Sequence, residues 1–269
     1  MTLWTVLDAL RSTAPGLYIT FFLLLGLIMG SLMTVIVTRL PWTLENEDID
    51  PWFLWRPASH CPRCRTPILW YHNLPLLGWL RLRGRCRHCQ QPIGKLYPFL
   101  EVGGGLIFAA LAWVVTSSDE VVALALLAWF LLALAVLDWK HYFLPDSLTQ
   151  PLLWIGLMWH ALLLPEQLVD AVIGTIAGYL ALRGINVAWY LCRGYDGLGR
   201  GDAKLLAALG AWLGWQALPL VCLLAALMGI VGFLACFGLK NASRQQIPFG
   251  VPLALAGWGL ACWQLVNLQ

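Results

Sequence analysis

The sequence predicts an all-α polytopic membrane protein of about eight transmembrane helices, with a small cytoplasmic domain between the first two. Three observations lead to this prediction. The 269 residues are 60% hydrophobic and only 12% charged, which leaves too little polar surface to cover a soluble globule. Several apolar runs reach the roughly 20 residues that a helix needs to cross a bilayer. A single long segment, residues 39–97, interrupts this apolar pattern.

Eight apolar runs are expected to form the membrane helices. They lie near residues 17–38, 98–116, 121–138, 149–163, 168–191, 203–216, 218–239 and 249–266. No small-residue cleavage site follows the first run, so we expect it to remain as an anchor. The chain is therefore divided into an N-terminal segment with the first helix (1–38), a cytoplasmic domain (39–97) and a transmembrane domain (98–269).

The basic residues predict the orientation, because Lys and Arg stay on the cytoplasmic side during insertion. If both termini lie outside, all Lys and Arg residues except Arg11 and Arg183 fall inside. The inside residues are Arg39, Arg56, Arg63, Arg65, Arg81, Arg83, Arg85, Arg87, Lys95, Lys140, Arg193, Arg200, Lys204, Lys240 and Arg244. Arg183 falls within the fifth helix, where it would extend to the membrane surface or pair with a carboxylate. The net charge of +3 thus reflects topology and does not indicate nucleic-acid binding.

Four cysteines in the 39–97 segment predict a metal site. They form two C-x-x-C pairs, "CPRC" with Cys61 and Cys64 and "CRHC" with Cys86 and Cys89. Four thiolates complete the tetrahedral shell that zinc prefers in structural sites. The alternative is a pair of disulfides or free thiols, but the predicted cytoplasmic location is reducing and so small a segment has little core of its own. We therefore expect a small domain that zinc holds together.

Three carboxylates lie at ends of the predicted helices, and ionisable groups at membrane depth tend to mark functional sites. Glu101 begins the second helix, Asp138 ends the third, and Asp202 begins the sixth. The predicted orientation places all three near the cytoplasmic surface, so Asp138 and Asp202 could meet. Two carboxyl groups that share a proton can activate water and protonate a scissile carbonyl, as in aspartyl proteolysis. Alternatively, Asp138 is a surface acid at a helix end and Asp202 a simple N-cap.

The surroundings of Asp202 add to the proteolytic interpretation. Gly199 and Gly201, in "GLGRGD", let the backbone approach a peptide strand closely. The start of the sixth helix also presents its positive dipole end to the carboxylate. Asp146, which follows Pro145, is interpreted as the N-cap of the fourth helix.

Five sequence features together resemble the type IV prepilin peptidases of bacterial type IV pilus and type II secretion systems, over nearly the whole chain. They are "GSLMTVIVTRLP" (30–41), the two C-x-x-C pairs, "DWKHYFLPD" (138–146), "GRGD" (199–202) and "PFG" (248–250). The sequence departs from the family pattern at Thr34, where the family usually has asparagine, and at Val251, where a proline often follows "PFG".

This resemblance implies a bifunctional enzyme of the bacterial inner membrane with its active site near the cytoplasmic face, and the distribution of basic residues predicts that both termini are periplasmic. Asp138 and Asp202 would be the catalytic pair of a G-x-G-D membrane aspartyl endopeptidase. The substrates would be prepilins or pseudopilins, whose short basic leader is cut off after a glycine. The new amino terminus would then be methylated with S-adenosylmethionine.

Some assignments stay open. The residues that would bind S-adenosylmethionine cannot be identified, since no glycine-rich turn of a soluble methyltransferase is present. Glu101 is an accessory candidate, or a structural partner of Arg183 or of a helix end. Lys204 would tune the pKa of Asp202 or merely lie at the inner surface.

Two other functions compete with the bifunctional enzyme. One is a leader peptidase without methylation, to which the departure at Thr34 points. The other is a nonenzymatic, zinc-stabilised transport or assembly factor. A transport path would place acids at several membrane depths, whereas both key aspartates fall at helix ends on one side.

Overall fold

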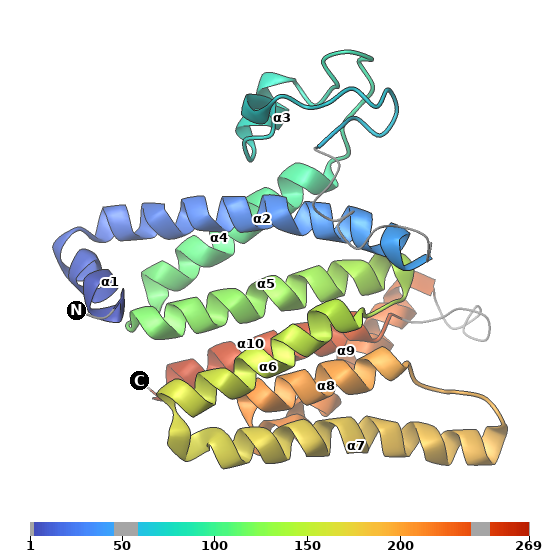
Figure 1. Ribbon diagram of the computed structural model, residues 1–269. Helices are drawn as coiled ribbons and strands as arrows, with labels where there is room; N and C mark the ends of the chain where they lie inside the picture. The colour runs from blue at the N-terminus through green and yellow to red at the C-terminus, as the bar shows by residue number, and fades with distance from the viewer. Residues whose placement is uncertain (1–2, 46–58, 238–247, 269) are drawn as a thin grey trace. The chain divides into compact units, whose positions relative to one another are not determined.

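The computed structural model describes residues 3–45, 59–237 and 248–268, and within them the chain is helical (Figure 1). Extended pairing in the described residues is limited to two isolated bridges, His60 with Pro67 and Arg85 with Pro92. The chain forms two compact units, Met1–Trp129 and Phe130–Gln269. The predicted all-α class is confirmed. Arg56, Lys240, Arg244 and residues 46–58 of the predicted cytoplasmic domain lie outside the described residues.

The first unit is built around a pair of long helices. Its elements are α1 (Leu3–Thr13), α2 (Pro15–Glu45), the short helices η2 (Trp70–His72) and α3 (Leu77–Arg81), α4 (Leu96–Val114) and the beginning of α5 (Ser118–His141). Helix α1 was not predicted, because "LWTVLDALRST" is amphipathic and lacks the continuous apolar run of a membrane span. Helix α2 begins at Pro15, which suits a first helical position, and continues beyond the predicted end through Pro41.

Small residues let α2 and α4 approach closely. A side-chain Cβ on Gly26 would lie 2.4 Å from the carbonyl oxygen of Gly104, and one on Gly30 would lie 2.6 Å from the carbonyl oxygen of Leu100. Such close backbone packing is the usual way in which membrane helices associate. The "GS" of the prepilin-peptidase-like motif therefore lies at this helix contact, next to Glu101.

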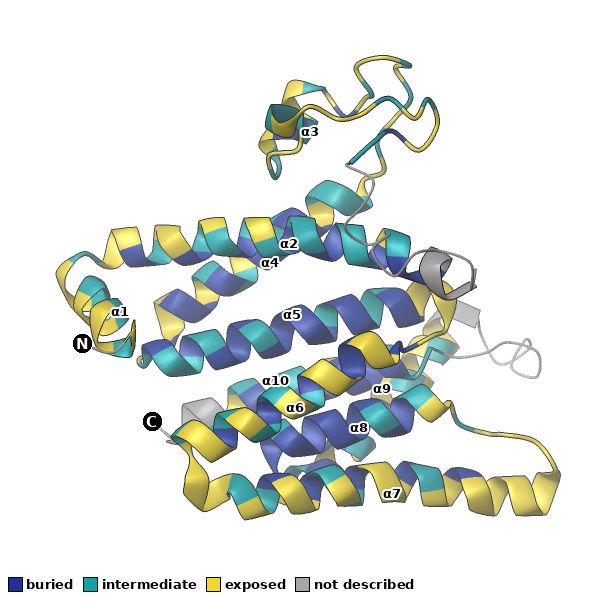
Figure 2. Ribbon diagram, in the orientation of Figure 1, coloured by how far each residue is buried: buried dark blue, intermediate teal, exposed yellow. Residues whose placement is uncertain are grey.

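The second unit packs its remaining helices around α8. Its elements are the end of α5, α6 (Asp146–Leu163), η3 (Pro165–Gln167), α7 (Leu168–Arg193), α8 (Arg200–Leu213), η4 (Trp215–Ala217), α9 (Leu218–Phe237) and α10 (Gly250–Leu268). Figure 2 shows that α8 is buried along most of its length, whereas α7 exposes much of its surface. The backbones of α7 and α8 touch, since a Cβ on Gly174 would lie 2.5 Å from the carbonyl oxygen of Gly210.

The eight predicted apolar runs correspond to α2 and α4 to α10. Among the described residues, five helical stretches are long and apolar enough to cross a membrane: Pro15–Pro41, Leu96–Val114, Ser118–His141, Pro165–Arg193 and Trp215–Ala235. Helices α6, α8 and α10 are not in this set. Helix α8 has 14 residues, and at about 1.5 Å per residue it is shorter than the bilayer core. A multi-pass membrane protein is nonetheless confirmed.

Candidate active site and metal centre

Asp202 lies in the first turn of α8, and its side chain is buried, with 8% of the residue exposed. The N-cap is Gly199, so the interpretation of Asp202 as a simple N-cap is wrong. Its carboxylate instead accepts a hydrogen bond from the backbone N–H of Gly199. A Cβ on Gly199 would lie 2.9 Å from Asp202 Oδ2. The first glycine of "GRGD" therefore keeps open the space that this carboxylate occupies.

The loop that leads into "GRGD" is held by Asn186 of α7, which the sequence analysis did not single out. Asn186 is buried, and its Oδ1 accepts the backbone N–H groups of Gly197 and Leu198, each at 2.9 Å. Its Nδ2 donates to Asp196 Oδ1 at 2.8 Å. One amide side chain thus satisfies three polar groups just before α8. The signal in the sequence was a single polar residue inside the otherwise apolar run 184–192.

Asp138 lies in the last turn of α5 and is 5% exposed. The alternative of a surface acid at a helix end is therefore wrong. Its Oδ2 accepts the backbone N–H of Val251 at 3.2 Å, and the N–H of Gly250 contributes a second hydrogen bond. A Cβ on Gly250 would lie 2.8 Å from the same oxygen. Gly250, the glycine of "PFG", is thus the residue at the N-terminus of α10 that packs against the Asp138 carboxylate.

The structure brings Asp138 and Asp202 together within the second unit. The charge of Asp138 acts directly on the carboxyl group of Asp202. Leu144, which is buried, lies between their supporting glycines: a Cβ on Gly201 would be 2.7 Å from Leu144 Cβ, and one on Gly250 would be 3.0 Å from Leu144 Cδ1. Two carboxyl groups from distant parts of the chain therefore share one buried site.

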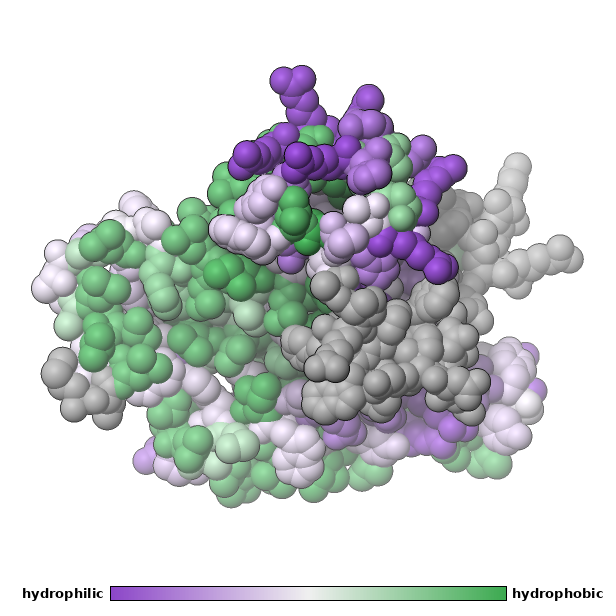
Figure 3. Space-filling view, turned by 45° about the horizontal axis from the view of Figure 1, so that its top comes forward, coloured by the Kyte–Doolittle hydropathy of each residue, from purple (hydrophilic) through white to green (hydrophobic). Residues whose placement is uncertain are grey.

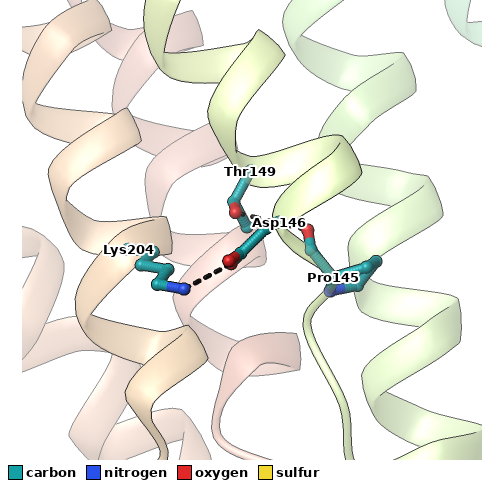
Figure 4. Close-up of polar contacts among 4 residues, drawn as sticks. All are labelled: Pro145, Asp146, Thr149 and Lys204. Atoms are coloured by element: carbon teal, nitrogen blue, oxygen red, sulfur yellow. Dashed lines mark hydrogen bonds and ion pairs between the residues drawn. The ribbon is translucent and has the colours of Figure 1, made fainter. Parts of the chain in front are cut away.

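Lys204 forms its ion pair with Asp146 and not with Asp202, at 2.5 Å between Nζ and Oδ1 (Figure 4). The N-cap of α6 is Pro145, whose carbonyl oxygen accepts the N–H and the hydroxyl of Thr149. The assignment of Asp146 as the N-cap is therefore wrong, because its carboxylate turns to Lys204. Arg183 of α7 is partly exposed and forms no ion pair with a described residue.

The four predicted cysteines come together in the first unit. Their sulfur atoms all lie within 4.8 Å of one another, with Cys61 and Cys89 at 3.8 Å and Cys64 and Cys86 at 3.9 Å. These separations are far longer than the roughly 2.05 Å of a disulfide. The disulfide alternative does not fit, and the four free thiols suit a tetrahedral metal ion.

Two copies of the same turn present these thiols. In the first, Cys61 donates its N–H to the carbonyl oxygen of Thr66, and in the second Cys86 donates to Gln91. Arg65 and Gln90, which directly follow the second cysteine of each pair, both adopt a left-handed conformation, with φ of 54° and 57°. Each C-x-x-C pair therefore forms a sharp turn with both sulfur atoms on the same side.

Hydrogen bonding prepares some of these thiols for metal binding. Hydrogen bonds with the hydroxyl group and the backbone of Thr66 lower the pKa of Cys64 to about 6. Backbone hydrogen bonds from Cys89 and His88 lower the pKa of Cys86. A backbone hydrogen bond from Gln91 favours the Cys89 thiolate, but desolvation and the neighbouring sulfurs outweigh it and raise the pKa of Cys89 to about 11. Without a cation, the cluster therefore cannot readily hold four negative charges.

Glu101 lies in α4, buried, and serves as a structural junction of the first unit. Its Oε2 accepts the backbone N–H of Leu76 at 2.8 Å, and Ser31 of α2 adds a side-chain hydrogen bond. Leu76 has a φ of 58°, a left-handed conformation that is uncommon for a bulky residue. Glu101 thus ties the cysteine-containing segment to the α2–α4 pair. Because Leu76 is the N-cap of α3, the predicted pairing of Glu101 with a helix end is confirmed.

Two pockets have linings that include neither Asp138 nor Asp202. One of about 580 Å³ is lined by Trp70, Tyr71, His72, Arg81, Leu82 and Arg87 of the first unit. The other, of about 350 Å³, includes His160, Trp212 and Gly214 at the far end of α8 from Asp202.

Comparison with known proteins assigns the family. The family model described as the bacterial peptidase A24 N-terminal domain matches residues 24–115, and the type IV leader peptidase family matches residues 125–234. A prepilin leader peptidase/N-methyltransferase of Aeromonas hydrophila is 44% identical over 93% of this chain and 92% of its own. The chain belongs to the type IV leader peptidase family. Similarly named relatives of Stutzerimonas stutzeri and Pseudomonas aeruginosa are each 40% identical, covering 93% and 96% of this chain and 92% and 94% of their own.

The family assignment confirms the resemblance inferred from the motifs and favours an enzyme over a nonenzymatic transport or assembly factor. No solved structure matches the chain. The leader peptidase model includes Asp138 and Asp202, and the N-terminal model includes the four cysteines and Glu101. The roles of these individual residues stay predictions.

Proposed function

We propose that this protein is a membrane-embedded aspartyl endopeptidase that removes the leader of type IV prepilins or pseudopilins, and that Asp138 and Asp202 are its catalytic pair. The observation that carries this proposal is the buried, electrostatically coupled pair of carboxyl groups. Membership of the leader peptidase family and the names of the relatives support a prepilin substrate. Cleavage after a glycine, near the cytoplasmic face, is part of the same proposal.

The surroundings of the pair suit one negative charge shared by two carboxyl groups. Asp202 lies at the N-terminus of α8, and Asp138 accepts N–H groups at the N-terminus of α10. The positive ends of two helix dipoles therefore favour an anion here. Two close carboxyl groups cannot both ionise cheaply, so one retains a proton. The ionised member would take a proton from a water molecule that attacks the scissile carbonyl, while the protonated member donates to the carbonyl oxygen.

The second proposed reaction is methylation of the new amino terminus with S-adenosylmethionine, which the names of the relatives support. The alternative is a peptidase that does not methylate. Mass spectrometry of a prepilin incubated with the purified protein and S-adenosylmethionine separates these cases. We expect loss of the leader and, at the new terminus, a gain of the mass of one methyl group. Loss of the leader alone would support the peptidase without methylation, and an intact prepilin would contradict both activities.

We propose zinc as the metal of the four-cysteine cluster. All four donors are sulfur, the donor type that structural zinc sites use most, and the thiols are close enough for one ion to reach all of them. When bound, the ion would neutralise the thiolates and join the two C-x-x-C turns. Because the cluster has four protein ligands and no open position, its proposed role is structural.

The proposed location is the bacterial inner membrane, with both termini periplasmic and the carboxylate pair near the cytoplasmic face. The distribution of Lys and Arg residues along the sequence supports this orientation. A reporter enzyme that is active only in the periplasm should be active when it is fused after Asp119. A reporter that is active only in the cytoplasm should be active when it is fused near Arg85. The reverse pattern would contradict the orientation.

A further inference from the structure

The pocket at Tyr71 is the clearest binding feature that the proposed reactions do not use. Two guanidinium groups converge on this ring: Arg81 Cζ lies 5.6 Å from the ring centroid, and Arg87 Nη1 donates to the Tyr71 hydroxyl at 3.5 Å. Trp70 and His72 complete the aromatic wall, with ring centroids 5.7 Å and 4.5 Å from that of Tyr71. The pocket has a volume of about 580 Å³ and opens to the surface.

The charged residues of the segment that forms this pocket are all basic. Residues 59–95 contain six arginines and one lysine but no aspartate or glutamate. Neither Arg81 nor Arg87 forms an ion pair with a described residue, so most of their N–H donors are available. Figure 3 shows hydrophilic residues gathered over this segment. A pair of guanidinium groups at an aromatic wall suits a phosphate group, to which arginine binds in a bidentate manner.

Exposed apolar side chains lie on the same segment as the pocket. Trp70 is 77% exposed, Leu77 62% and Leu80 53%. The segment is also tethered to a membrane-spanning helix, because α4 begins directly after Lys95 and Leu76 donates to Glu101 in its second turn. Cationic residues next to tryptophan and leucine side chains are typical of surfaces that lie in the headgroup layer of an anionic leaflet.

We propose that the Tyr71–Arg81–Arg87 pocket binds the phosphate headgroup of an anionic phospholipid, while Trp70, Leu77 and Leu80 contact its acyl region. A phospholipid accounts for both the guanidinium pair and the apolar rim, whereas free phosphate accounts only for the first. S-adenosylmethionine fits less well, because two guanidinium groups repel its sulfonium and ammonium groups and the residues that line the pocket include no carboxylate. The lipid would thereby hold the cysteine-containing segment against the membrane surface.

The test measures lipid binding to the full chain, purified in a nonionic detergent, by native mass spectrometry. We expect phosphatidylglycerol to bind more tightly than phosphatidylcholine of the same acyl chains. Replacing Arg81→Gln together with Arg87→Gln should weaken phosphatidylglycerol binding by about ten- to thirtyfold, given the usual contribution of each basic residue at an anionic surface. The matched control, Arg83→Gln with Arg85→Gln, removes the same charge outside the pocket and should change binding by less than about threefold.

Three results would overturn this proposal. The first is unchanged phosphatidylglycerol binding by the Arg81/Arg87 variant while its metal content matches that of the unsubstituted protein. The second is an equal loss in the Arg83/Arg85 variant, which would mean that diffuse charge attracts the lipid. The third is binding of inorganic phosphate or S-adenosylmethionine that depends on Arg81 and Arg87 when the lipid does not. Lipid binding is measured without a prepilin substrate, so the result is independent of the proposed peptidase activity.

Discussion

The cysteine-containing segment and the carboxylate site hold their reactive groups by opposite means. In residues 59–95, short turns and backbone hydrogen bonds hold four thiols, of which Cys61 is buried and the other three are partly exposed. In the second unit, Asp138 and Asp202 are buried side chains on long helices, and Leu144 packs between their supporting glycines. The first site would depend on a bound metal ion to become rigid, whereas the second is built by helix packing.

This difference has a physical reason. The segment 59–95 contains few buried apolar side chains, so it lacks the core that would order four thiols by itself. A coordinated metal ion would supply that order. The paired carboxyl groups require a setting with little water and fixed N–H donors, which the ends of α8 and α10 provide. We therefore expect small substitutions at the carboxylate site to reduce the rate of cleavage severely. Substitutions at the cysteine cluster should reduce the rate of cleavage less.

The largest expected effect comes from replacing either aspartate. Asp138→Asn or Asp202→Asn keeps the side-chain shape but removes the ability to exchange a proton. Each variant should lose at least about 10³-fold in the rate of leader removal, and the double variant should be hardly worse, because the two groups act as a unit. The measurement is cleavage of a prepilin in detergent or proteoliposomes.

Metal content and membrane insertion are measured as controls for both aspartate variants. Both should stay unchanged, because the cysteines belong to the other unit. Substantial turnover by a correctly inserted Asp138→Asn or Asp202→Asn protein would contradict the catalytic assignment.

A smaller but still severe effect is expected from Gly250→Ala. The added Cβ would lie 2.8 Å from Asp138 Oδ2 and 3.0 Å from Leu144 Cδ1, so the carboxylate or the start of α10 must move. A displacement of about 1 Å at a catalytic group can cost on the order of 10²-fold in rate. Cleavage should fall by roughly that amount, with the protein still inserted in the membrane.

Gly259→Ala is the matched control for this substitution, since it lies in the same helix and a Cβ there meets no atom within 4 Å. It should cleave at nearly the unsubstituted rate. Equal rates for the Gly250 and Gly259 variants would mean that the contact between α10 and Asp138 is unimportant for cleavage.

The helices and the cysteine cluster could be predicted because their signals are local. A long apolar run predicts a membrane helix, and C-x-x-C spacing predicts two ligands on one turn. The proximity of Asp138 and Asp202 was inferred only from a shared membrane depth and the family resemblance. No local pattern showed that Gly250 would meet Asp138, since 112 positions separate them and only the packing of α10 brings them together.

The errors in the prediction have the same origin. Asp146 follows a proline at a helix start and so has the pattern of an N-cap, but a lysine from α8 provides its carboxylate with a stronger partner. Asn186 was overlooked because its three hydrogen-bond partners lie beyond the end of α7, in the loop before "GRGD". Partner choice for a polar side chain is decided by tertiary structure, which the sequence pattern alone does not contain.

A moderate effect on cleavage is expected when the metal site is removed. The double change Cys61→Ser and Cys64→Ser eliminates two of the four sulfur donors. The purified protein should lose its zinc, close to one ion per chain, and segment 59–95 should become sensitive to proteases. Leader removal should decrease much less than in the aspartate variants, and methylation should decrease more than leader removal.

Cys192→Ser is the control for the metal-site change, because Cys192 is exposed on α7 and outside the cluster. It should retain full metal content. A protein without any bound metal whose 59–95 segment resists proteolysis would contradict the structural role of zinc, and cleavage as low as in Asp202→Asn would contradict the separation of the two sites.

The smallest effect is expected from the ion pair between Lys204 and Asp146. The Asp146 side chain is 61% exposed and that of Lys204 29%, so solvent screens much of their attraction. Exposed pairs typically contribute about 0.2–1 kcal/mol. Lys204→Met, Asp146→Asn and the double variant form a cycle in which thermal unfolding in detergent should give a coupling energy within that range. Cleavage should change by less than about threefold, because the pair lies outside the hydrogen bonds that hold Asp138 and Asp202. A much larger loss of cleavage in Lys204→Met than in Asp146→Asn would instead indicate that Lys204 acts on Asp202 directly, and would extend the catalytic site by one residue.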